Sequence, residues 1–163
     1  GGGYPRGMIE VGAVPRLCLV IDTNLWLDML VFDDPSTRRL ATLLDPPAVA
    51  PLASDAMRAE LADVIDRDRF GLAPEQRRAV LVRFDALVTP TQAAPDCRLP
   101  CRDPDDRKFL DLAVTHRADW LLSRDKALLA GRKAAWGRFG VRIGKVGDFY
   151  NWLDQAAAGT PRA

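Results

Sequence analysis

Short apolar runs alternate with longer helical segments along this chain, and the alternation limits the folds available to it. The run Leu17–Ile21 has no charged side chain and is typical of a strand that is buried on both faces. Helices are expected over residues 23–30, 36–44, 54–66, 74–87, 103–116 and 146–153, and further strands over residues 47–52, 118–122 and 141–143. This order predicts an α/β fold, a three-layer α/β/α sandwich with a central parallel sheet.

The composition excludes several classes of protein. The 163 residues include 23 Lys and Arg against 22 Asp and Glu, and the net charge of +1 excludes nucleic-acid binding through bulk positive charge. His116 is the single histidine, which excludes sites that need two imidazoles, and three cysteines do not make a disulfide framework. No apolar stretch approaches the ~20 residues of a membrane helix, and no secretory signal is seen. We therefore expect a cytoplasmic protein without a membrane partner.

One domain is expected, because a chain of this length is typical of a single hydrophobic core. Its predicted extent is residues 16–155. Residues 1–15 begin with a glycine-rich stretch and are interpreted as a flexible N-terminal tail or a non-native remnant. Residues 156–163 are rich in Ala, Gly and Pro and are expected to form a flexible C-terminal tail.

Four carboxylates lie at positions where the predicted burial makes a charged side chain energetically unfavourable. Asp22 follows the apolar run 17–21 and Asp125 follows the predicted strand 118–122, so both lie near carboxyl ends of strands. Glu60 and Asp106 lie on the apolar faces of their predicted helices. Singly, such acids are often helix caps or first-turn acids favoured by the helix dipole. Together they indicate one site, because ligands of parallel-sheet folds bind beyond the carboxyl ends of the strands.

Converging carboxylates repel one another and raise each other's pKa unless a cation neutralises them. The set offers hard oxygen ligands and neither His nor paired Cys, which favours Mg²⁺ or Mn²⁺ over zinc. Three acids lie close together at residues 103–106, and Asp103 and Asp105 are alternatives to Asp106 as the metal ligand. Asp103 is expected to cap the helix, with Pro104 at its first position.

Four blocks of sequence carry a resemblance to a known family. They are Val20-Ile21-Asp22-Thr23-Asn24, Ser54 with Glu60-Leu61, the segment from Asp103 to Ala113, and Leu122-Ser123-Arg124-Asp125. In order and spacing they resemble the PIN-domain nucleases, and the similarity extends over residues 16–153. The most similar branch is that of VapC-like toxins of toxin–antitoxin systems, whose third block begins with the same Asp-Pro-x-Asp pattern.

The resemblance implies a PIN-like fold and a metal-dependent endoribonuclease that cleaves RNA phosphodiester bonds with Mg²⁺ or Mn²⁺. It further implies the toxin of a type II toxin–antitoxin system, a homodimer and a cognate antitoxin protein. The catalytic acids carried over by position are Asp22, Glu60, Asp106 and Asp125, and Asp22, Asp106 and Asp125 would bind the metal. The supporting positions carried over are Thr23, Asn24 and Ser123, where the family more often has Thr in place of the last.

An acidic pocket repels RNA, so a basic rim must hold the substrate. The tract from Gly131 to Lys145 has five bases and no acid: Arg132, Lys133, Arg138, Arg142 and Lys145. Trp136 and Phe139 lie among them and would allow bases to stack. The alternative is that both aromatic side chains belong to the core beneath a solvated charged face.

Two other functions remain open. A PIN fold can serve as a non-catalytic module that binds RNA or protein, although all four expected acids are present. A Mg²⁺-binding phosphoacceptor signalling domain would need an acid pair after the first strand and a Lys after the last, which Asp22-Thr23-Asn24 and Gly144-Lys145 satisfy only in part. A phosphatase resembling haloacid dehalogenases would need a second Asp at the position of Asn24.

Overall fold

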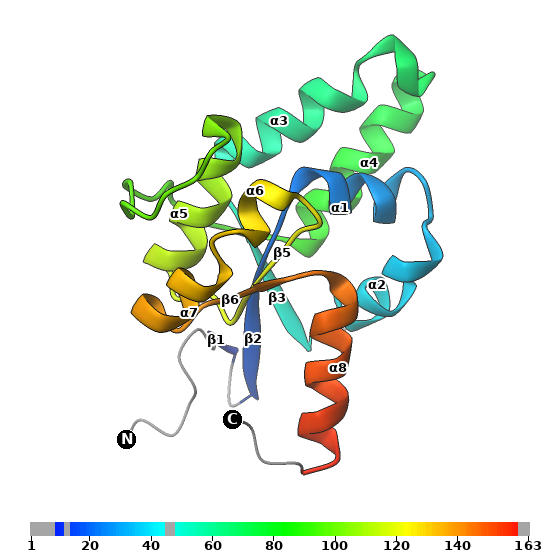
Figure 1. Cartoon of the computed structure of the whole chain (residues 1–163). Helices are drawn as coiled ribbons and strands as arrows, with labels where there is room; N and C mark the ends of the chain where they lie inside the picture. The colour runs from blue at the N-terminus through cyan, green and yellow to red at the C-terminus, as the bar shows by residue number, and fades with distance from the viewer. Residues whose placement is uncertain (1–8, 12–13, 45–47, 160–163) are drawn as a thin grey trace.

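Figure 1 shows the computed structural model of the chain, which describes residues 9–11, 14–44 and 48–159. A parallel sheet lies at its centre, with the strands in the order β4-β3-β2-β5-β6. These strands are β2 (Val14–Ile21), β3 (Val49–Ala53), β4 (Thr89–Pro90), β5 (Trp120–Leu122) and β6 (Arg142–Gly144). The predicted parallel sheet is therefore confirmed.

Helices cover both faces of the sheet. They are α1 (Thr23–Leu30), α2 (Arg38–Leu44), α3 (Asp55–Ile65), α4 (Pro74–Leu87), α5 (Arg107–Thr115), α6 (Lys126–Leu129), α7 (Arg132–Phe139) and α8 (Val146–Ala157). Figure 1 shows α5 and α7 on one side of the strands and α2 and α8 on the other. This is the three-layer α/β/α arrangement that the sequence predicts. In the part of the chain that the structure describes, no helix has the length and apolar character needed to cross a bilayer.

The amino end of β2 begins earlier than predicted. Strand β1 (Ile9–Val11) pairs antiparallel with it, Ile9 opposite Arg16. The partners of β2 in the parallel sheet reach it only from Leu17 onward, so β1 supplies hydrogen-bonding groups for the protruding end. Strand residues thus lie inside the segment 1–15 assigned to a tail, and α8 likewise runs into the segment 156–163. Residues 1–8 and 160–163 of the two predicted tails lie outside the described residues.

Besides β1, one further strand and two α-helices escape the sequence patterns. Helix α7 has no apolar stripe of helical period, and Ala135 is its one buried residue. Helix α6 is a single turn, and β4 has two residues, so neither is long enough to show a period. The predicted helices and strands are confirmed to within a few residues, and the boundaries of α1 agree to the residue. The predicted helices over 36–44 and 103–116 begin with 3₁₀ turns, and residue 47 of the predicted strand 47–52 lies outside the described residues.

The core explains why these elements assemble. Leu19, Val20 and Ile21 of β2 are completely buried, as expected for a central strand covered on both faces. Trp26 of α1 packs edge to face on Phe84 of α4, with 4.8 Å between ring centroids. This packing fixes the position of α1 where it leaves the sheet.

The carboxyl ends of the strands meet at one edge of the sheet. The Asp22 backbone N–H donates to the Leu122 carbonyl (3.1 Å), and the Ser123 N–H donates to the Gly144 carbonyl (3.0 Å). These bonds extend the pairing of β2, β5 and β6 by one residue. The side chains that follow the strands are thereby placed side by side.

Candidate metal centre

Asp22 is fixed at the end of β2 by two hydrogen bonds. Its Oδ1 accepts from the Leu25 N–H (3.0 Å) and so caps α1, and its Oδ2 accepts from the Ser123 hydroxyl. The residue is 4% exposed. Burial raises the pKa of Asp22 above its usual range, while the bonds from Ser123 and Leu25 oppose the shift. Asp22 is therefore both a helix cap and an acid of this edge.

Asp103, Asp106 and Asp125 form an acidic cluster beside Asp22. Each places a carboxylate oxygen so that the three oxygens lie within 4.8 Å of one another. Asp103 caps the 3₁₀ turn Pro104–Asp106 through the Asp105 N–H (2.9 Å), which confirms the cap predicted for it. Asp125 caps α6 through the Ala127 N–H (2.7 Å). The caps leave oxygens of both carboxylates free to face Asp106.

Asp106 has the most perturbed environment in this cluster. Its pKa is raised to about 7, first by burial, then by the hydrogen bond with Asp125 and by the charges of Asp125, Asp103 and Asp22. A hydrogen bond between two carboxyl groups needs a proton on one of them, and when both are ionised the buried Oδ2 of Asp106 has no donor. A buried carboxylate oxygen without a donor is costly, and a cation bound among these acids would satisfy it. The donor set, all hard oxygens, fits Mg²⁺ or Mn²⁺.

Glu60 lies on α3 and points to a different neighbour. Its Oε1 accepts from the Thr23 hydroxyl (2.6 Å), and its Oε2 is paired with the Lys108 ammonium. Glu60 is not among the acids whose oxygens converge with Asp106. Of the acids predicted to bind metal, Asp106 and Asp125 converge with Asp103. Asp22 is connected to Asp125 through Ser123 but lies outside the group within 4.8 Å. Glu60 also lies outside that group and is paired with a base.

The supporting positions differ in their contacts. Ser123 is fully buried, and its hydroxyl both donates to Asp22 and accepts from the Asp125 N–H (2.9 Å), so it connects two acids. Thr23 connects α1 to Glu60. Asn24 is exposed in the first turn of α1.

Sequence reasoning missed two bases at this edge. Lys108 lies two residues after Asp106, on α5. Arg124, between Ser123 and Asp125, forms two bonds to the buried Asp28 carboxylate (2.9 and 3.2 Å). The sequence showed only that each base lies within an acidic block. It could not show the ion pairs, because Glu60 and Asp28 come from distant parts of the chain.

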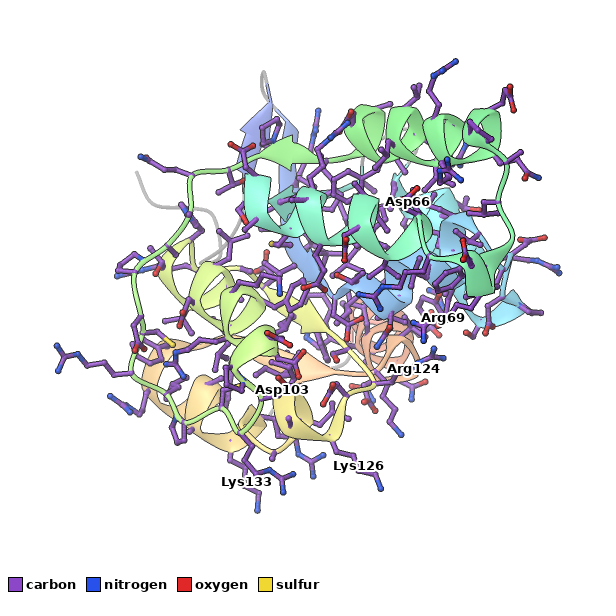
Figure 2. The ribbon with its side chains drawn as sticks, turned by 90° about the horizontal axis from the view of Figure 1, so that it is seen from above. Asp66, Arg69, Asp103, Arg124, Lys126 and Lys133 are labelled. Carbon is purple, nitrogen blue, oxygen red and sulfur yellow. The ribbon has the colours of Figure 1, made fainter. Side chains whose placement is uncertain are left out.

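The predicted basic tract is split by the fold. Arg132 and Lys133 begin α7 and, with Lys126 of α6, line a surface hollow of about 380 Å³. Lys145 follows β6 and is exposed at the same edge of the sheet. Figure 2 looks down on this edge and shows the Lys126 and Lys133 side chains extending outward beside the loop of Asp103. These bases form a rim next to the acidic cluster.

Arg142 and Arg138 lie away from that rim. Arg142 pairs with Trp120 at the amino end of β5, the end opposite the acids. Its guanidinium lies 4.1 Å from the centroid of the Trp136 ring and 5.4 Å from that of Trp152. Arg138 is in the last turn of α7. The tract is thus not one continuous surface.

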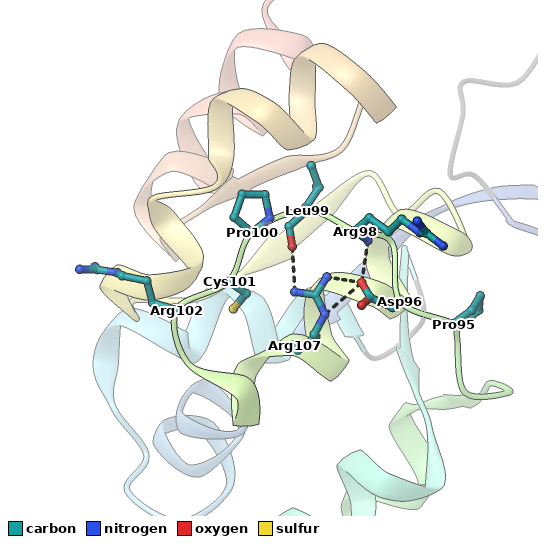
Figure 3. A pocket seen from close by; sticks show the side chains of 8 residues that line it. All are labelled: Pro95, Asp96, Arg98, Leu99, Pro100, Cys101, Arg102 and Arg107. Atoms are coloured by element: carbon teal, nitrogen blue, oxygen red, sulfur yellow. Dashed lines mark hydrogen bonds and ion pairs between the residues drawn. The ribbon is translucent and has the colours of Figure 1, made fainter.

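A second cluster, of Asp96, Cys97 and Asp111, also has ligand atoms close together. Figure 3 shows the Arg107 guanidinium bonded to Asp96 and to the Leu99 carbonyl (2.8 Å). The same guanidinium lies 3.6 Å from Asp111. A cation built into the chain already neutralises these acids. The cluster fixes the loop that leads to Asp103, and the three cysteines are free thiols.

Comparisons with known proteins agree with this architecture. A crystal structure of VapBC2 from Rickettsia felis, bound to a DNA fragment from their promoter, contains a chain with the same fold, at a TM-score of 0.54 and 14% identity. The match covers 78% of this chain and 97% of that chain. No curated protein matches the sequence. The family model of the PIN domain matches residues 18–127, a range that holds all four acids, and the chain therefore belongs to the PIN domain family.

Proposed function

We propose that this protein is a metal-dependent endoribonuclease that hydrolyses RNA phosphodiester bonds with Mg²⁺ or Mn²⁺. The observation that carries the proposal is the buried, unpartnered Oδ2 of Asp106 among the carboxylates of Asp22, Asp103 and Asp125. Such a site is unfavourable by itself and becomes favourable when a divalent cation is bound.

In this proposal Asp22, Asp106 and Asp125 hold the metal. A bound divalent cation supplies a water of lowered pKa and positive charge for the phosphate oxygens. Ser123 orients the Asp22 carboxylate and the Asp125 backbone. Thr23 of α1 donates to Glu60 of α3 and orients its carboxylate. Burial of Asp22 strengthens its interaction with the cation because little water competes for it.

The phosphoacceptor alternative is less well supported by the geometry. Asp22 is 4% exposed, and both of its oxygens accept hydrogen bonds. A carboxylate that is phosphorylated must reach its phosphodonor, whereas a metal ligand can remain buried. The non-catalytic module remains the second candidate, because a PIN fold can bind RNA without cutting it.

We further propose a biological role as the toxin of a type II toxin–antitoxin system. The VapBC2 structure, named for both components and bound to their promoter DNA, supports this role through a shared fold. The role implies a cognate antitoxin protein, a homodimer and a cytoplasmic location.

Incubation of the purified protein with labelled single-stranded RNA tests the activity. We expect cleavage in Mg²⁺ or Mn²⁺, loss of cleavage in excess chelator, and recovery when the metal is restored. Intact RNA in both metals, with RNA binding preserved, would instead support the non-catalytic module.

Removal of the rim charges should weaken RNA binding. The variant is Lys126→Ala/Arg132→Ala/Lys133→Ala, measured in chelator so that RNA stays intact. Each lost phosphate contact lowers the slope of log affinity against log salt by about 0.7 for single strands, so we expect a decrease of about 2. Arg138→Ala, at the far end of α7, is the matched control and should keep the wild-type slope. An unchanged slope in the triple variant would place the RNA elsewhere.

A further inference from the structure

Lys108 forms an ion pair with Glu60, a contact that a metal site built from four acids does not require. Its ammonium is paired with Glu60 Oε2 and also donates to the Asp105 carbonyl. The same ammonium lies 4.8 Å from the centroid of the Phe109 ring. Only 24% of the Lys108 side chain and 30% of the Glu60 side chain are exposed. The pair is thus a partly buried contact between α5 and α3 rather than a solvent-exposed ion pair.

Both oxygens of Glu60 are in use. Oε1 accepts from Thr23 and Oε2 is paired with Lys108, so neither oxygen is left without a partner. Asp106 differs, because its buried Oδ2 has no hydrogen-bond partner. Both oxygens of Asp22 also accept hydrogen bonds, but from neutral donors. Glu60 differs from Asp22 and Asp106 because it is already paired with a positive charge.

We infer that Lys108 is a built-in cation that takes the place of a second metal ion next to Glu60. The inference rests on the proposed metal centre and specifies its stoichiometry: one divalent cation per chain, bound by Asp22, Asp106 and Asp125. Lys108 is a positioning residue in this arrangement, since it acts by keeping Glu60 out of the ligand set. Loss of its charge would leave a carboxylate free beside other acids, which favours binding of a further divalent cation.

Titration of the full-length protein with Mn²⁺, followed by calorimetry, tests the inference without any measure of activity. We expect one Mn²⁺ per chain for wild type and two for Lys108→Met. The double variant Lys108→Met/Glu60→Gln should return to one, because the freed carboxylate is then gone. Arg58→Met removes the base of another ion pair of α3, the one with Asp85 at 2.7 Å, and is the matched control, expected to bind one.

Glu60→Gln alone provides a second test that needs no change at Lys108. It should keep one Mn²⁺ per chain with an affinity within about tenfold of wild type, the smallest loss typical of groups that contact a ligand rather than the metal. Two Mn²⁺ in wild type, one in a folded Lys108→Met, or a larger loss in Glu60→Gln would each overturn the inference. Absence of Mn²⁺ binding in wild type would overturn the proposed metal centre itself.

Discussion

Asp22→Asn is expected to abolish RNA cleavage and to leave the fold at least as stable as wild type. Asp22 would contribute a charged oxygen to the metal, and loss of residues that merely orient a ligand already costs roughly 10- to 100-fold. We therefore expect a loss of activity of more than about a hundredfold. Stability should not fall, because burial raises the pKa of Asp22 and the charged form is unfavourable in the folded protein without metal. Asn also caps helices as well as Asp does.

Cleavage rates and thermal unfolding in chelator, measured on the same preparations, check both halves of this prediction. Asp63→Asn is the matched control: Asp63 is exposed on α3 and makes a surface ion pair with Arg67 at 3.3 Å. Such pairs contribute about 0–1 kcal/mol, so activity and melting temperature should hardly change. Asp22→Asn with wild-type cleavage in Mg²⁺ free of contaminating nuclease would contradict the assignment. A lower melting temperature would show that the Asp22 charge stabilises the fold.

The fold could be predicted where local sequence and tertiary structure agree. The run Leu17–Ile21 is apolar because β2 is the central, buried strand. Pro74 can begin α4 because the N–H groups of a first helical turn have no acceptor within the helix, so the N–H that proline lacks is not needed there. The prediction failed where the packing of an element leaves no periodic hydrophobic pattern in the local sequence. Helix α7 buries one residue, and β1 exists only because the start of β2 protrudes beyond its parallel partners.

The candidate site likewise contains residues that the local sequence predicts and residues whose contacts depend on tertiary packing. Asp22 and Asp125 follow buried strands, so their placement depends on the parallel sheet alone. The pairing of Glu60 with Lys108 depends on how α3 packs on α5, which no local pattern specifies. Asp103 shows a third situation, since its predicted cap is confirmed and the same side chain also faces the acidic cluster. A carboxylate has two oxygens, and a role for one does not exclude a role for the other.

Divalent cation should stabilise the protein strongly, and more at pH 8 than at pH 6. At a concentration 100 times the dissociation constant, a ligand that binds only the folded state contributes about 2.7 kcal/mol. For a chain of this size that corresponds to a rise in melting temperature of roughly 5–10 °C. The pKa of Asp106 is about 7, so at pH 6 most of its carboxyl must lose a proton before it can bind metal. Affinity should therefore fall about tenfold between pH 8 and pH 6.

Without metal the dependence on pH has the opposite sign. The folded protein holds the Asp106 proton more tightly than the unfolded chain, where the pKa is the ordinary 3.8, so stability falls as pH rises from about 4 through 7. Asp119, at the amino end of β5, adds to this decline because burial raises its pKa to about 6. Only the difference between metal-bound and metal-free melting temperatures isolates the cluster. We expect that difference to widen from pH 6 to pH 8 in wild type and to become small and independent of pH in Asp106→Asn. A difference of equal size at both pH values in wild type would mean that Asp106 does not bind the ion, because no proton would then be displaced from it.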